Sequence, residues 1–211
     1  MKVQAKICGL SDAPTLDAAV RAGAGYVGFM FFPPSPRAVR PEQAAPLVRA
    51  VPERVKSVGV FVDPDDALLE RVLKDVPLDI IQLHGDEPVE RVAAIKERTG
   101  LSVIKVFKIA EADDFQPARR YEQVVDYLMF DAKPPKDATR PGGNAVAFDW
   151  TLLRGQDWAK PWFLAGGLTI DNVAGAVKMT GARLVDASSG VEESVGRKNP
   201  DMIRKFLAQL A

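Results

Sequence analysis

Eight short apolar runs, rich in Val, Ile, Leu and Phe, recur along the 211 residues of this chain. Each has the length and composition of a β-strand and ends in a polar or glycine-containing turn. The runs begin at Val3, Tyr26, Val55, Asp79, Ser102, Tyr127, Pro161 and Ala182. The chain therefore repeats one unit, a strand followed by a turn, eight times.

Helix signals follow the turns. Asp12, Asp63 and Asn199 stand where helix N-caps are expected, while Pro41 and Pro88 stand where a first helical turn would begin. A strand followed by a helix, repeated eight times, predicts the α/β class and a (β/α)₈ TIM barrel. A doubly wound open sheet is the structural alternative.

The chain length agrees with a single barrel. One unit of about 5 strand residues, about 11 helix residues and two loops of about 4 takes roughly 24 residues, so eight units need roughly 190. A chain of 211 residues leaves no room for a second domain, and no stretch has the composition of a linker. We therefore expect residues 1–211 to form one barrel domain.

Charge and cysteine content limit the partners. Lys plus Arg equals Asp plus Glu at 28 each, so no net field attracts nucleic acid or an anionic membrane. The single cysteine cannot form an intrachain disulfide, and the apolar stretch 26–32 is too short to span a bilayer. We expect a cytoplasmic protein, a monomer or weak homodimer, whose partner is a small molecule.

Cys8 ends the first run, and barrels place their active sites at the carboxyl ends of strands. The two-residue period of a strand puts Lys6 on the same face as Cys8. A positive charge there could favour a thiolate over a thiol whose ordinary pKa is about 8.5. Cys8 is therefore a candidate general base. The alternatives are a small core residue for Cys8 and a structural ion pair for Lys6.

Asp131 ends the sixth run, in YLMFDAK (127–133). In a closed ring of eight strands, the sixth lies three places from the first, so Asp131 and Cys8 would face each other across the pocket. That arrangement suits an acid on one side of a substrate and a base on the other. An aspartate that caps the next turn is the alternative.

Arg37 and His84 are two further candidates for substrate contact. Pro33, Pro34 and Pro36 stiffen the loop that carries Arg37, and a guanidinium held there can bind a carboxylate through two hydrogen bonds. His84, the only histidine, could be a base, a ligand contact or a structural residue, and we favour a contact. One histidine and one cysteine give little support to a transition-metal centre, so we expect no metal.

The last two strand ends carry small residues, in LAGGL (164–168) and DASSGVE (186–192). Backbone N–H groups in such turns can point at an anion, and the loops after strands 7 and 8 commonly hold phosphate in barrels. Glycines that merely turn the chain are the alternative for either cluster alone. The candidate substrate-binding residues here are Gly166, Gly167, Asp186, Ser188, Ser189 and Gly190.

Together these segments resemble the phosphoribosylanthranilate isomerase family over essentially the whole chain. KICG and SSGVE lie at opposite ends with SPR between them, in an order that an accidental match would not produce. The matching segments are KICGL (6–10), GFMFFPPSPRAV (28–39), VGVFV (58–62), QLHGDE (82–87), FDAKP (130–134), FDW (148–150), LAGGLTIDNV (164–173) and DASSGVE (186–192).

The resemblance implies a barrel of the ribulose-phosphate-binding type and a cofactor-free Amadori rearrangement of N-(5-phosphoribosyl)anthranilate in tryptophan biosynthesis. By that likeness Asp131 is the general acid that opens the sugar ring, and Cys8 is the general base that removes the C2 proton. Arg37 would hold the anthranilate carboxylate, and the glycine loops would hold the phosphate. The alternatives are a barrel that binds a phosphorylated ligand without turnover, and another sugar-phosphate isomerase or epimerase.

The chain departs from the family pattern at one place. Family members usually have a GGTG-like turn before FDW, whereas this chain has Asn144 and Ala145 in place of the threonine and the last glycine. If that glycine adopts a positive φ, Ala145 costs about 1 kcal/mol, and the loop would follow another path. The stretch 133–147 is long for a barrel loop and predicts a mobile lid.

Overall fold

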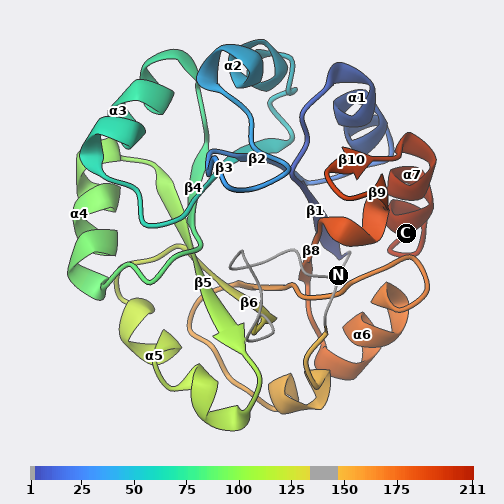
Figure 1. The fold of residues 1–211 in the computed structure, drawn as a ribbon. Helices are drawn as coiled ribbons and strands as arrows, with labels where there is room; N and C mark the ends of the chain where they lie inside the picture. The colour runs from blue at the N-terminus through green and yellow to red at the C-terminus, as the bar shows by residue number, and fades with distance from the viewer. Residues whose placement is uncertain (1–2, 134–146) are drawn as a thin grey trace.

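The eight predicted strands form a closed parallel barrel. The computed structural model describes residues 3–133 and 147–211, and in it each strand pairs with the next while β8 pairs with β1 (Figure 1). The prediction of a (β/α)₈ barrel is confirmed, and the open sheet is excluded. The strands are β1 (Gln4–Cys8), β2 (Tyr26–Met30), β3 (Lys56–Phe61), β4 (Ile80–Leu83), β5 (Ser102–Ile109), β6 (Tyr127–Ala132), β7 (Trp162–Leu164) and β8 (Leu184–Ala187).

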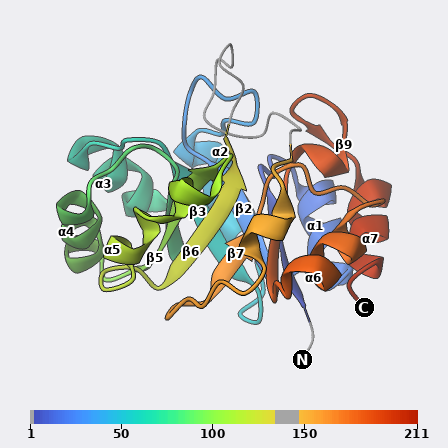
Figure 2. The same ribbon diagram turned by 90° about the horizontal axis from the view of Figure 1, so that it is seen from below.

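Helices surround the barrel on its outside (Figures 1 and 2). The α-helices are α1 (Ala13–Arg21), α2 (Pro41–Arg49), α3 (Asp66–Asp75), α4 (Val89–Thr99), α5 (Ala118–Tyr121), α6 (Val173–Thr180) and α7 (Pro200–Ala208). Several begin where the sequence predicts. The Asp12 side chain accepts the Thr15 N–H at the start of α1, and the Asn199 side chain accepts two N–H groups at the start of α7. No helix among the described residues is long and apolar enough to cross a membrane.

Among the described residues, two of the eight units show no full-length helix after the strand. β5 is followed by the 3₁₀ helix η1 (Ala112–Phe115) and the single turn α5, and in the described part after β6 only the 3₁₀ helix η2 (Trp150–Leu153) occurs. Gly155 has a φ of 75° just after η2, which a longer helix could not accommodate. The prediction of a helix after every strand is therefore too regular for this part of the chain.

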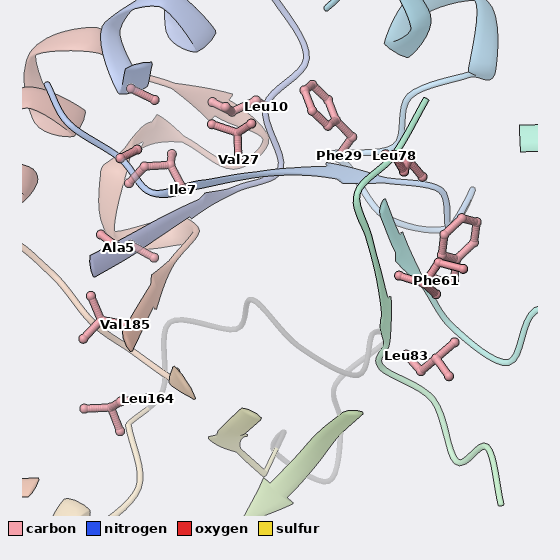
Figure 3. Close-up of a cluster of buried hydrophobic side chains, with 14 of the residues drawn as sticks. Ala5, Ile7, Leu10, Val27, Phe29, Phe61, Leu78, Leu83, Leu164 and Val185 are labelled. Atoms are coloured by element: carbon pink, nitrogen blue, oxygen red, sulfur yellow. The ribbon is translucent and has the colours of Figure 1, made fainter. Parts of the chain in front are cut away.

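Apolar side chains fill two layers, one inside the barrel and one between the barrel and the helices. Ile7, Val27 and Phe61 belong to the outer layer and point away from the barrel axis (Figure 3). The inner layer consists of Tyr26, Val58, Ile80, Ile104, Val106, Met129, Phe163, Ala165 and Leu184. Because side chains alternate along a strand, Asp131 shares the inward parity of Met129, and Asp186 shares that of Leu184.

A buried ion pair lies within the barrel, above part of the inner apolar layer. Lys6 of β1 is fully buried, and its Nζ lies 2.8 Å from Oδ1 of Asp186 on the neighbouring β8. An unpaired ammonium would be costly at this depth, and the contact with Asp186 offsets that cost. The interior thus changes from apolar to charged towards the carboxyl ends of β1 and β8.

Candidate active site

Cys8 lies at the carboxyl end of β1, directly above Lys6, and only 5% of the surface of Cys8 is exposed. Gly28 on the adjacent β2 faces it, because a Cβ on that glycine would lie 3.1 Å from Sγ of Cys8 and 3.2 Å from Cε of Lys6. A larger residue at position 28 would displace both side chains. The predicted placement of Cys8 and Lys6 on one inward face is therefore found.

Burial raises the pKa of the Cys8 thiol, and the positive charge of Lys6 opposes this without overcoming it. The predicted direction of the Lys6 effect is therefore found, although burial outweighs it in the free protein. The negative charge of Asp186 also raises the pKa of Cys8. The ion-pair interpretation of Lys6 is the one that the structure supports. Fewer molecules carry a thiolate at neutral pH, but each thiolate is a stronger base.

We expect the rate of Cys8 alkylation to keep rising with pH beyond the ordinary thiol value of about 8.5, because a thiol with a raised pKa loses its proton only at higher pH. Lys6→Met should move this rise to still higher pH, since it removes a charge that lowers the pKa of Cys8. The measurement is the pH dependence of Cys8 alkylation, which reports the thiol alone. An unchanged profile in Lys6→Met would exclude electrostatic coupling between the two side chains.

Lys6→Met leaves Asp186 unpaired, so a matched variant is needed. Lys6→Met combined with Asp186→Asn removes both charges and tests whether a lost fold, rather than lost coupling, alters the profile. Because Lys6 acts on Cys8 more strongly than Asp186 does, the double variant should also show the rise at higher pH than the wild type.

Asp131 ends β6 beside His84, which directly follows β4. Nε2 of His84 lies 3.3 Å from Oδ2 of Asp131, in electrostatic contact but without the alignment of a hydrogen bond. Nε2 of Gln82 lies 3.3 Å from Nδ1 of His84. With an amide donor at Nδ1, a neutral ring carries its proton on Nε2, facing Asp131. His84 therefore contacts the predicted acid, which sequence reasoning did not foresee.

Gly166 fixes the position of Asp131. Oδ1 of Asp131 accepts the N–H of Ala132 at 2.8 Å, and a Cβ on Gly166 would come within 2.6 Å of that same nitrogen. Gly166 also has a φ of 84°, a region that disfavours side chains. The first glycine of LAGGL is thus required by the packing around Asp131, whatever its neighbours bind.

A second buried ion pair holds the loop that carries His84. Oε1 of Glu87 accepts the N–H groups of Asp63 and Gly85, while Nζ of Lys105 donates to Oε2 of Glu87 and to the carbonyl of Gly85. This explains the glutamate of QLHGDE, to which the sequence analysis gave no role. A hollow of about 350 Å³ adjoins this pair beside β5, and Cys8 and Asp131 do not line it.

Arg37 lies at the β1 side of the barrel mouth, where its side chain packs over Gly9. Its Nε and Nη2 donate to the two carboxylate oxygens of Glu192, at 2.6 and 2.8 Å. The prediction of a rigid, bidentate arginine is supported, but its partner in this structure is a residue of the same chain. Glu192 lies 155 positions away in the sequence, so local patterns could not reveal the pair.

Lys198 also binds Glu192. It belongs to the short antiparallel hairpin of β9 (Glu192–Ser194) and β10 (Arg197–Lys198), which begins just after η3 (Ser189–Val191). Its buried Nζ lies 2.5 Å from Oε1 of Glu192 and 3.4 Å from Oγ of Ser188. Neither Lys198 nor Glu192 is among the residues that the sequence predicts for the site. The only local signal was the acidic residue that ends DASSGVE.

The two glycine loops touch each other, as the predicted phosphate site requires. A Cβ on Gly190 would overlap the carbonyl oxygen of Leu168, at 1.9 Å, so only glycine fits there. The side chain of Asn172 organises the first loop, because it donates to the carbonyl of Gly167 and accepts the N–H of Thr169. Ser189 and Gly190 lie in the 3₁₀ helix η3 (Ser189–Val191), next to this contact.

Two other sequence-based expectations concern this face of the barrel. The predicted lid at 133–147, with Asn144 and Ala145, lies almost entirely outside the described residues. Asp186, predicted to bind substrate, is engaged with Lys6 in this structure. In the described part of the chain, no three His, Cys, Asp or Glu side chains gather as metal ligands would.

Comparisons with known proteins agree with this arrangement. Residues 5–209 match the family model of N-(5'-phosphoribosyl)anthranilate (PRA) isomerase. The N-(5'-phosphoribosyl)anthranilate isomerase of Paramagnetospirillum magneticum is 55% identical over 207 residues, which cover 98% of this chain and 96% of that protein. The enzyme of the same name from Paracoccus denitrificans is 56% identical over 209 residues, covering 99% and 97% of the two chains.

Solved structures give the same result. The phosphoribosyl anthranilate isomerase of Thermotoga maritima superposes with a TM-score of 0.89 at 34% identity, covering 99% of this chain and 98% of that one. Another isomerase structure contains reduced 1-(o-carboxyphenylamino)-1-deoxyribulose 5-phosphate and superposes with a TM-score of 0.84 at 33% identity, with the same coverage. Fold, strand-end residues and sequence thus all lead to one conclusion: this chain belongs to the N-(5'-phosphoribosyl)anthranilate isomerase family.

Proposed function

We propose that this chain catalyses the Amadori rearrangement of N-(5'-phosphoribosyl)anthranilate to 1-(2-carboxyphenylamino)-1-deoxyribulose 5-phosphate, a step of tryptophan biosynthesis. The observation that carries the proposal is the position of Cys8 and Asp131. Cys8 is the last residue of β1 and Asp131 the last but one of β6, and both occupy inward-facing positions at the same mouth of the closed barrel. Counted through β7 and β8, β6 lies three places from β1. A thiol and a carboxyl group can therefore act on two sides of one sugar.

The reaction proceeds in three steps. Asp131 donates its proton to the ring oxygen of the sugar, the C1–O bond breaks, and an open-chain Schiff base forms. The thiolate of Cys8 then removes the proton from C2, and the electron pair of that C–H bond moves to give an enolamine. The enolamine takes up a proton at C1 while its C2 hydroxyl loses one, which gives the ketone. All atoms of the substrate remain in the product, so no cofactor or outside redox partner is needed.

Other residues hold the substrate. Arg37 receives the aromatic carboxylate, because a guanidinium has five N–H donors and Glu192 takes two of them. The loops of Gly167, Ser189 and Gly190 receive the phosphate through backbone N–H groups, as such turns commonly do. His84 steadies the acid, since its ring lies against the Asp131 carboxyl.

The direct test is a fluorescence assay. Phosphoribosylanthranilate made in situ from anthranilate and a phosphorylated ribose donor should lose its emission as the protein consumes it. A barrel that only binds a phosphorylated ligand would bind a product analogue and leave the emission unchanged. An epimerase would act on sugar phosphates that lack the aromatic ring, so ribulose 5-phosphate serves as the negative control.

The cellular setting follows from the same chemistry. A thiol base must stay reduced, so we place the protein in the cytoplasm. All proposed groups come from one chain, and we propose that residues 1–211 act as one barrel domain. A monomer or weak homodimer then suffices, because no residue from a second copy enters the mechanism.

A further inference from the structure

The residues that surround Arg37 carry an unbalanced charge. Glu192 is one carboxylate held between two cations, Arg37 and Lys198, and these three side chains are at most 4% exposed. Its Oε2 also accepts the N–H of Gly196 at 3.2 Å. Both oxygens of Glu192 are therefore occupied by donors. Burial lowers the pKa of Lys198 and Glu192 opposes this, and with Lys198 protonated the group Arg37, Glu192 and Lys198 has a net charge of +1.

Other charged side chains on this side of the barrel are paired among themselves, as Arg197 is with Glu193. Lys6 and Asp186 form a neutral pair at 2.8 Å, and Cys8 above them is a neutral thiol because burial raises its pKa. Without Lys198, Arg37 and Glu192 would form a neutral pair with little attraction for an anion. A buried net charge of +1 calls for an anionic partner, and no residue among those described supplies it.

We propose that Lys198 is a positioning residue for the substrate carboxylate: it shares Glu192 with Arg37 and so keeps the Arg37 end of the site cationic. The proposal rests on the proposed function, which places the anthranilate carboxylate at Arg37. Lys198 touches no substrate atom in this scheme. It acts through Glu192, and it gives the hairpin of β9 and β10 a role in recognising an aromatic acid.

Gly196 allows the hairpin to pack against the loop of Arg37. A Cβ on Gly196, at the hairpin turn, would lie 2.7 Å from the carbonyl oxygen of Pro36, so the turn packs directly against the loop of Arg37. Gly196 has a φ of 82°, which other residues rarely adopt. The backbone contact and the shared Glu192 together tie the β8 side of the mouth to the β2 side.

The experiment compares two ligands that differ only in the carboxylate. One is reduced 1-(o-carboxyphenylamino)-1-deoxyribulose 5-phosphate, and the other is the same compound without the carboxyl group. Calorimetry gives Kd for both ligands. The Kd of the ligand without the carboxyl group, divided by the Kd of the ligand with it, measures how much affinity the protein gains from the carboxylate. We expect Lys198→Met to lower this ratio about tenfold by weakening only the carboxylate ligand. Lys198→Arg should restore it.

Two further variants separate charge from structure. Glu192→Gln raises the net charge of the cluster to +2, so the ratio should not fall. Lys105→Met is the matched control, because Lys105 is also a buried lysine paired with a buried glutamate, on another part of the barrel. It should change both Kd values by the same factor. If Lys198→Met melts at a much lower temperature, Lys198→Gln gives the same ratio test with a polar side chain.

The outcomes distinguish the two proposals. A wild-type ratio near one would remove Arg37 as the carboxylate clamp, and the proposed function would lose that part. A large wild-type ratio that persists in Lys198→Met would overturn the role of Lys198 while leaving the clamp intact. An equal fall of the ratio in Glu192→Gln would also overturn it, because orientation rather than charge would then be responsible.

Discussion

Replacing Cys8 with alanine should lower kcat by a factor of about 10² to 10⁴, the range that a positioned general base contributes. The thiolate is the group at this end of the mouth that we propose takes the C2 proton, and alanine cannot replace it. The change in packing is small, because alanine lacks only the sulfur atom that lies beside Gly28. Decay of phosphoribosylanthranilate fluorescence at saturating substrate measures kcat.

Binding and stability serve as the controls for Cys8→Ala. The variant should bind the reduced product analogue with a Kd close to that of the wild type, and it should melt within a few degrees of it, as expected for the loss of one small buried group. A rate within tenfold of wild type would reject Cys8 as the base. A rate lost together with ligand binding would indicate a damaged fold instead.

Asp131→Asn should reduce kcat by a similar factor of about 10² to 10⁴, because an amide cannot donate the proton that opens the sugar ring. The change is nearly isosteric. The amide oxygen can still accept the Ala132 N–H, as Oδ1 of Asp131 does at 2.8 Å. The same fluorescence assay measures the effect.

A substrate that is already open offers a sharper test of this role. The enolamine stage lies after ring opening, so exchange of a C1 proton of the product with solvent should continue in Asp131→Asn. It should continue in Cys8→Ala as well, because the exchange needs only the enolamine, whereas Cys8 acts on the C2 proton. If Asp131→Asn loses the exchange, ring opening is not the only step that Asp131 serves.

The fold was largely predictable from the sequence because each strand–helix unit carries local signals. Apolar runs mark the strands, and residues such as Asp12 and Asn199 mark helix starts through hydrogen bonds within a few positions. The prediction of a helix after every strand was wrong where the sequence carries weak helix signals. After β6, Asp149 caps only the short 3₁₀ helix η2 in the described part of that unit, because no long apolar period follows it.

The candidate site was predictable in position but less so in electrostatics. Parallel strands bring their ends together, so Cys8 and Asp131 could be placed at one mouth without coordinates. The pairs of Arg37 with Glu192 and of Lys6 with Asp186 join residues 155 and 180 positions apart, so spacing gives no hint of them. The raised pKa of Cys8 likewise depends on burial, which a single sequence does not reveal.

The closed ring of strands brings together residues from both halves of the chain, and this has a practical consequence. Cys8 belongs to the first strand and Asp131 to the sixth, so a cut between α4 and β5 gives two fragments that each hold only one of the two groups. With the roles proposed for Cys8 and Asp131, we expect neither fragment to turn over the substrate alone, and we expect turnover to return when the strands reassemble into the ring. Loss of fluorescence would then signal that two fused partners have brought the halves together.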